Sequence, residues 1–157
     1  MQDPADEFAA LAAEVARRAT AAGLTVAAAE SLTSGAITNA LGAAPDASQW
    51  LRGGVIAYAE EVKREVLGVT ADDITSARCA RELAAGVAGL LGADAAVSVT
   101  GVGGPEPDDG EPAGSVYAAV TVRGDVRETH FQFDGDPSEV VHQTVRAALE
   151  LLRDALP

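Results

Sequence analysis

The sequence lacks most features that mark disulfide-stabilised, membrane or nucleic-acid-binding proteins. Its 157 residues include a single cysteine, Cys79, so no internal disulfide can form, which agrees with a reducing compartment. No stretch of ~20 apolar residues free of charge and glycine occurs, and we expect no membrane helix. Basic residues number only 11 against 24 acidic ones. The resulting net charge of −13 makes nucleic acids and anionic membranes poor partners.

Metal-ligand patterns and export signals are missing as well. One cysteine, two distant histidines and scattered carboxylates do not form a metal-binding constellation. The acidic residues Asp108, Asp109 and Glu111 lack the ligand spacing of a cation-binding loop. We therefore expect neither a metal nor another cofactor. The acidic N-terminus has no uninterrupted apolar run, unlike a signal peptide, and a cytoplasmic protein is expected.

The chain is rich in apolar residues, which make up 48% of it, but only 4% of its residues are aromatic. Its core is therefore expected to consist of small aliphatic side chains. Helices are predicted from Pro4 to Gly23, from the turn at Ser31 to about Gly42, over 60–67 and 76–91, and from Pro137 onward. Strands are predicted before Glu30, over 53–58 and 95–100, and as a hairpin over 114–122 and 126–133. Residues 43–48 are predicted to form a loop.

This alternation predicts an α/β fold over residues 1–157. We expect a single layered domain whose mixed, mostly parallel sheet is flanked by helices, with one C-terminal β-hairpin. The helix over 76–91 is the most clearly amphipathic, with one predicted inward face made by Ala80, Leu83, Ala84, Val87, Leu90 and Leu91. In the last helix, the predicted inward residues are Val141, Val145, Ala148, Leu149 and Leu152.

The first candidate site is the turn that follows the small-residue strand 26–29. It carries Glu30, Ser31, Thr33 and Ser34 just before a helix. A strand that turns sharply into a helix exposes the turn residue and directs unpaired N–H groups outward. The turn therefore suits a serine nucleophile or a bound anion. The alternative is that Ser31 or Thr33 simply caps the helix.

A serine nucleophile needs a base, and the histidines are poor candidates for that role. His130 falls in a predicted strand and His142 beside apolar positions of the last helix, so a Ser-His-Asp triad is not expected. Lys63, five residues after Tyr58, is the better candidate, because a desolvated lysine can lose its proton near neutral pH. The alternative is that its mixed-charge neighbourhood is a solvated helix face.

A second candidate site is the glycine-rich loop that starts at Thr100. Residues 101–104 read Gly-Val-Gly-Gly, and glycine permits backbone N–H groups to approach a phosphate or an oxyanion closely. The loop is neither a P-loop nor a dinucleotide fingerprint, because Pro105 and acidic residues follow it. Ligands of open α/β sheets gather at the carboxyl ends of strands, so this loop, Ser31 and Tyr58 are expected to converge.

Three groups of residues together follow the pattern of one protein family. They are Ala28–Gly35, then Gly53–Tyr58 with Lys63 and Leu67–Val69, then Val99–Pro105 with Pro112–Tyr117. In this order, and over nearly the whole chain to about residue 150, they resemble the CinA C-terminal domain family. These are the nicotinamide-nucleotide amidohydrolases, or NMN deamidases. Because the chain starts at Met1 directly with its first helix, it resembles the stand-alone form of the family.

The resemblance implies a metal-independent cytoplasmic α/β enzyme of NAD metabolism. It would hydrolyse the carboxamide of nicotinamide mononucleotide (NMN), its small-molecule partner, to nicotinate mononucleotide and ammonia. It implies Ser31 as the nucleophile, with Lys63 and Tyr58 as its proton-handling partners. The expected substrate-binding residues are Glu30, Thr33, Ser34, Gly35, Thr100, Gly101, Gly103 and Gly104.

The chain also departs from the family pattern. Leu32 and Ser34 stand where the family usually has Cys and Gly, and the segment 106–109 is acidic where glycines are common. Pro137 and Val141 occupy two positions where the family typically carries arginine. Arg146 is the nearest cation that could substitute. A non-catalytic nucleotide- or partner-binding member, or an amidase for another small amide, are therefore the alternative functions. A homo-oligomer is expected in each case.

Overall fold

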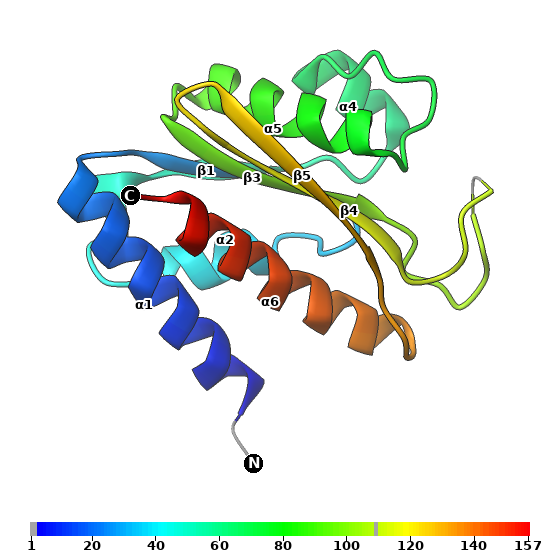
Figure 1. Cartoon of the computed structure of the whole chain (residues 1–157), viewed down its shortest axis with the longest axis horizontal. Helices are drawn as coiled ribbons and strands as arrows, with labels where there is room; N and C mark the ends of the chain where they lie inside the picture. The colour runs from blue at the N-terminus through cyan, green and yellow to red at the C-terminus, as the bar shows by residue number, and fades with distance from the viewer. Residues whose placement is uncertain (1–2, 109) are drawn as a thin grey trace.

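The computed structural model describes residues 3–108 and 110–157, in which a five-stranded sheet lies between two layers of helices (Figure 1). The strand order is β2-β1-β3-β4-β5. Their bounds are β1 (Val26–Glu30), β2 (Leu51–Ile56), β3 (Ala95–Gly101), β4 (Ser115–Val122) and β5 (Asp125–Gln132). β1 pairs in parallel with β2 and β3, whereas β3–β4 and β4–β5 are antiparallel. The predicted mixed sheet and hairpin are confirmed, with parallel and antiparallel pairings in equal number.

The helices divide between the two faces of this sheet. They are α1 (Pro4–Ala22), α2 (Ala36–Gly42), α3 (Ala47–Trp50), α4 (Glu60–Leu67), α5 (Ala77–Leu91) and α6 (Pro137–Ala155). Figure 1 shows α1, α2 and α6 on one face and α4 and α5 on the other. None of these described helices has the length and apolarity that a membrane span requires.

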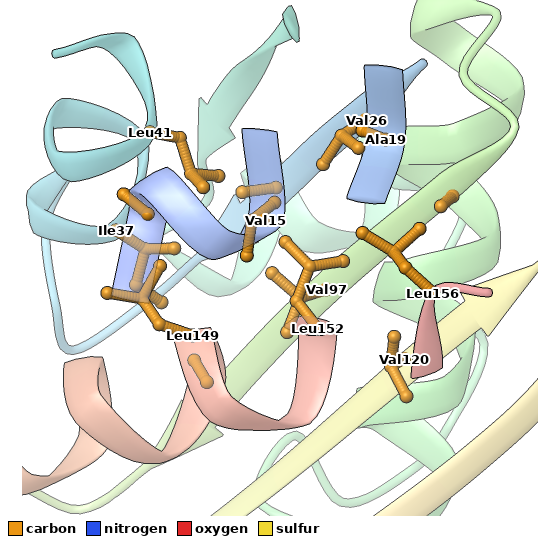
Figure 2. Close-up of a cluster of buried hydrophobic side chains, with 14 of the residues drawn as sticks. Val15, Ala19, Val26, Ile37, Leu41, Val97, Val120, Leu149, Leu152 and Leu156 are labelled. Carbon is orange, nitrogen blue, oxygen red and sulfur yellow. The ribbon is translucent and has the colours of Figure 1, made fainter. Parts of the chain in front are cut away.

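Small aliphatic side chains fill both interfaces between helices and sheet. On the α1, α2 and α6 side, Val15, Ile37, Val97, Leu149 and Leu152 are all fully buried in one cluster (Figure 2). On the other side, α4 and α5 bury a second cluster that includes Leu67, Cys79, Leu83 and Val87. Because β1 and β3 are covered on both faces, nearly every residue in them is buried, as the apolar run over 95–100 predicts.

Local capping explains why the main helices begin and end where the sequence predicts. The carboxylate of Asp3 accepts the N–H of Ala5 at the start of α1, and Gly23 ends that helix with a left-handed φ of 68°. The carboxylate of Asp136 accepts the N–H of Glu139 at the start of α6, 2.8 Å away. Such caps act within a few residues, so a sequence pattern is enough to locate them.

Four details differ from the predictions. Residues 47–50 form the short helix α3, which includes the last two residues of the predicted loop 43–48 and the two residues after it. The second strand lies two residues earlier than predicted, which puts Tyr58 in the β2–α4 connection. In the last turn of α5 Leu91 packs against the second cluster, whereas Leu90 is 54% exposed. In α6 Val140 is buried and Val141 is only partly buried.

Candidate functional site

The structure brings Ser31 and Lys63 together, although 32 positions separate them in the sequence. The Nζ atom of Lys63 lies 3.1 Å from the Oγ atom of Ser31 and 3.1 Å from the backbone carbonyl oxygen of Tyr58. Both side chains are buried, with Lys63 2% exposed and Ser31 7% exposed. The candidate nucleophile and base are therefore close enough for direct proton transfer, which needs about 2.6–3.2 Å between the two atoms.

The alternative of a solvated face is wrong for Lys63. Its neighbours Glu60, Glu61 and Glu65 on α4 are exposed, whereas Lys63 turns inward between α4 and the sheet. Burial of an amine removes the hydration that stabilises its ammonium form, and so favours the neutral amine. A neutral lysine nitrogen has the lone pair that a general base requires.

Tyr58 lines the same cavity, but its observed contact differs from the expected one. The backbone carbonyl of Tyr58, rather than its hydroxyl, accepts a hydrogen bond from Lys63. Tyr58 is 68% exposed. Tyr58 therefore orients the Lys63 amine through its backbone, and a role of its hydroxyl in proton transfer stays a prediction.

Glu30 caps the N-terminus of α2, a role for which Ser31 and Thr33 are the candidates from the sequence. Its buried carboxylate, 1% exposed, reaches across the turn to the first residues of α2. One oxygen accepts the hydroxyl of Thr33 at 2.6 Å and the N–H of Ile37 at 2.9 Å. The other accepts the N–H of Thr38 at 2.8 Å and its hydroxyl at 2.7 Å. The turn that carries Ser31 is thus held from behind by a fully hydrogen-bonded anion.

The family resemblance assigns substrate contacts to Glu30, Thr33, Ser34 and Gly35, and these contacts stay a prediction. None of the four lines the cavity. Glu30 and Thr33 are buried against α2, and Ser34 is exposed outside the cavity. Because the Glu30 carboxylate already occupies the first N–H groups of α2, that helix end is not available to a substrate anion.

The cavity beside Ser31 and Lys63 has a volume of about 390 Å³. Thr100, Gly101, Gly103 and Gly104 line it, as the sequence predicts for that loop. The Thr100 hydroxyl donates to the carbonyl of Ile74, 2.7 Å away, so it can offer only its lone pairs to a ligand. A side chain at position 101 would come within 2.6 Å of the Ser115 carbonyl oxygen, so the close approach of β4 requires glycine there.

Backbone N–H groups of cavity-lining residues are the candidate donors to a developing oxyanion. The N–H groups of Leu32, Gly103 and Gly104 have no acceptor among residues 3–108 and 110–157. Leu32 directly follows the candidate nucleophile, which is the position that supplies an oxyanion-hole donor in serine hydrolases with a strand-to-helix nucleophile turn. The arrangement has the parts required for attack of a hydroxyl on a carbonyl carbon.

The two histidines lie away from this cavity, which agrees with the prediction that no Ser-His-Asp triad involves Ser31. His130 Nε2 is 2.8 Å from the hydroxyl of Ser115, and His142 pairs with Glu7. Arg146 also pairs with Glu7 and does not line the cavity. In the part of the chain that the structure describes, no group of His, Cys, Asp and Glu side chains could hold a metal ion.

The cavity also includes residues that the sequence did not assign to the site. They come from the 70–76 connection, the acidic loop and the start of α6: Ile74, Thr75, Glu106, Asp108, Pro137 and Val141. In the sequence, Glu106, Pro137 and Val141 stand out only as departures from the family pattern. Ile74 and Thr75 carry no motif, and only the path of the chain before α5 places them here.

Relatives of known structure share this architecture. A competence damage-inducible protein A from Klebsiella pneumoniae matches with a TM-score of 0.90 and 39% identity, covering 95% of this chain and 96% of that one. A CinA superfamily protein from Escherichia coli matches with a TM-score of 0.90 and 31% identity, covering 98% and 93%. A curated CinA-like protein from Gemmatimonas aurantiaca is 41% identical over 138 residues.

That match includes 84% of this chain but only 32% of the length of the Gemmatimonas protein. It likewise spans 34% of a competence-damage inducible relative from Desulforamulus reducens, to which it is 40% identical. The CinA C-terminal domain pattern matches residues 8–156, a range that contains the whole Ser31–Lys63 cavity. The chain belongs to the CinA C-terminal domain family.

Proposed function

We propose that this chain is an amidohydrolase that cleaves the carboxamide of NMN, releasing ammonia and nicotinate mononucleotide. The observation that carries the proposal is the buried contact of 3.1 Å between the Lys63 amine and the Ser31 hydroxyl. Without a functional role, a buried lysine would only lower the stability of the fold, because transfer of an ammonium group out of water costs free energy. The family membership supports a role in this reaction class, and the substrate follows from the resemblance of the motifs.

In the proposed mechanism the neutral Lys63 amine accepts the proton of Ser31 as Oγ attacks the carboxamide carbon. The carbonyl oxygen becomes an oxyanion, which the N–H groups of Leu32 and of the glycine loop stabilise. The C–N bond then breaks, and Lys63 returns the proton to the nitrogen, which leaves as ammonia. The product of this half-reaction is an ester between Ser31 and the nicotinoyl group.

Water completes the cycle by attacking that ester. Lys63 accepts a proton from the water, and the second tetrahedral intermediate expels the Ser31 oxygen, which recovers a proton from Lys63. The acid product leaves as a carboxylate. The cavity volume of about 390 Å³ lies within the range of roughly 300–1,000 Å³ typical of small-molecule sites.

Release of ammonia and nicotinate mononucleotide from NMN by the purified protein tests the proposal. Wild type should turn over NMN, and Ser31→Ala should lose at least about 10³-fold in kcat, since it lacks the nucleophile. Ser48→Ala is a matched control, because Ser48 is exposed on α3 and lies outside the cavity. Equal rates for wild type and Ser31→Ala would contradict the proposal. Thermal stabilisation by NMN with no product would favour a non-catalytic binding protein.

A further inference from the structure

A cluster of polar side chains at the base of the β3–β4 connection lies outside the cavity and has no role in the mechanism above. We propose that Glu111 and Ser115 are positioning residues, which hold the glycine loop so that its N–H groups remain at the reacting carbonyl. This inference rests on the proposed amide hydrolysis, in which the loop stabilises the oxyanion. Neither residue lines the cavity, so both act through the loop rather than on the substrate.

A chain of hydrogen bonds runs from β5 across β4 to the connection. The hydroxyl of Ser115, which is fully buried, donates to the Glu111 carboxylate 2.7 Å away. A carboxylate only accepts, so this bond uses the single hydroxyl proton of Ser115. The Nε2 atom of His130 lies 2.8 Å from the Ser115 oxygen and is therefore the donor of the second bond. The chain thus runs from His130 through Ser115 to Glu111, with each group donating to the next.

Tyr117 completes the cluster on β4. Its hydroxyl donates a long hydrogen bond of 3.4 Å to the other carboxylate oxygen of Glu111. Its ring stacks on that of His130, with the ring centroids 4.2 Å apart. Burial, and then the negative charge of Glu111, raise the pKa of the Tyr117 hydroxyl, which therefore stays protonated as a donor. Two hydroxyls of one strand thus hold the Glu111 carboxylate.

Backbone hydrogen bonds link this cluster to the glycine loop. The N–H of Val102 donates to the Ser115 carbonyl at 2.9 Å, and the Val102 carbonyl accepts the N–H of Gly114 at 2.7 Å. Farther out, Asp108 and Glu111 exchange backbone hydrogen bonds of 3.1 and 2.8 Å. Figure 1 shows the β3–β4 connection extending beyond the helices. Since helix packing does not hold this part of the chain, the Glu111 carboxylate ties it to the sheet.

Loss of this anchor should affect the transition state more than the binding of substrate. The oxyanion forms only after Ser31 attacks, so displaced N–H donors lower kcat and leave KM nearly unchanged. Complete removal of one oxyanion donor typically costs about 10²–10³-fold in kcat. A loop that is loosened rather than removed should cost less, on the order of 10-fold.

Steady-state kinetics with NMN test the inference. In Glu111→Ala and in Ser115→Ala we expect kcat to fall by about 10-fold or more, with KM within about 3-fold of wild type. Glu111→Gln should keep most of the wild-type kcat, because its amide oxygen can still accept the Ser115 hydroxyl.

Ser98→Ala is the matched control for loss of a buried serine. Ser98 is also fully buried, and its hydroxyl donates to the Ala80 carbonyl at 2.6 Å, away from the cavity. This variant should be less stable but should keep its kcat. Unchanged kcat in Glu111→Ala and Ser115→Ala, or an equal loss in Ser98→Ala, would overturn the inference. A loss that appears only in KM would overturn it as well.

Amide hydrogen exchange, followed by NMR, tests the anchor without turnover. The N–H groups of Val102 and Gly114 are hydrogen-bonded at the base of the loop. They should exchange roughly 5-fold faster or more in Glu111→Ala, and near the wild-type rate in Glu111→Gln. Equal exchange in wild type and Glu111→Ala would overturn the inference. Faster exchange in Glu111→Ala, combined with no turnover of NMN by wild type, would support the anchor and contradict the proposed hydrolysis alone.

Discussion

Replacement of Lys63 by methionine removes the amine while keeping an unbranched side chain of similar length in the same buried position. The contact that disappears is the 3.1 Å hydrogen bond to Ser31, together with the 3.1 Å bond to the Tyr58 carbonyl. If Lys63 is the general base, the variant should lose about 10²–10⁴-fold in kcat, the usual contribution of such a group. Lys63→Arg should also be inactive, because a guanidinium remains protonated and cannot accept the serine proton.

The stability of Lys63→Met should change far less than its activity. Loss of a donor to the Tyr58 carbonyl costs about 1–3 kcal/mol if no water replaces it. Removal of a buried amine offsets part of this cost, since methionine has no desolvation penalty. We therefore expect a net change within about 2 kcal/mol, or a Tm shift of a few degrees for a chain of this size.

Ammonia release with NMN, measured together with thermal unfolding, separates the effect on activity from the effect on stability. Arg64→Met is the matched control: it replaces a neighbouring long basic side chain on the same helix by methionine, and Arg64 does not line the cavity. Activity of Lys63→Met within about 10-fold of wild type would refute the assignment of Lys63 as the base. Equal losses of activity in Lys63→Met and Arg64→Met would refute it as well, because they would point to a general effect of replacing a basic side chain on α4.

Three further predictions concern the supports of the site and the core. Glu30→Gln should lower the free energy of unfolding by about 2–4 kcal/mol in chemical denaturation, because an amide cannot accept all four hydrogen bonds that the carboxylate accepts; an unchanged midpoint would contradict this. Gly54→Ala should lower the free energy of unfolding by about 1–3 kcal/mol, since the new Cβ would lie 2.2 Å from Thr38 Oγ1. Gly89→Ala on α5, where no atom lies within 4 Å of the new Cβ, should instead raise it by about 0.5–1 kcal/mol. Burial raises the pKa of the Cys79 thiol from 9.0 to about 11, so only the unfolded chain ionises between these values and stability should fall by on the order of 2 kcal/mol as pH rises from about 9 to 11. The slope of unfolding free energy against pH should be smaller in Cys79→Ala, and an identical slope would refute this cause.

The sequence predicts where the helices begin and end and in which order helices and strands follow along the chain, because those signals are local. Asp3 and Asp136 each precede a proline at the first helical position, and both cap the helix that follows. The glycine at position 23 ends α1 with the positive φ that glycine tolerates. Such features depend on a few neighbouring residues, so no tertiary information is needed to find them.

The geometry of the site depends on contacts that the local pattern does not contain. Whether Lys63 or its neighbours face inward depends on how α4 is rotated against the sheet, and four of its eight residues are charged glutamates or arginines. The position of Glu30 beneath α2 depends on the path of the turn through Ser34, which adopts a positive φ of 50°. The motifs indicate Ser31, Lys63 and the glycine loop, whereas the Glu30 cap and the remaining cavity wall depend on the tertiary fold.

The central claim is that the Ser31 hydroxyl, activated by Lys63, forms a covalent acyl-enzyme. An activated nicotinate ester, with a coloured phenol as leaving group, tests it by rapid mixing followed by peptide mass analysis. The account predicts a burst of about one phenol per active site in wild type, with the nicotinoyl group on the peptide that contains Ser31, and no burst in Ser31→Ala. A burst that persists in Ser31→Ala, or an acyl group located on another peptide, would contradict it.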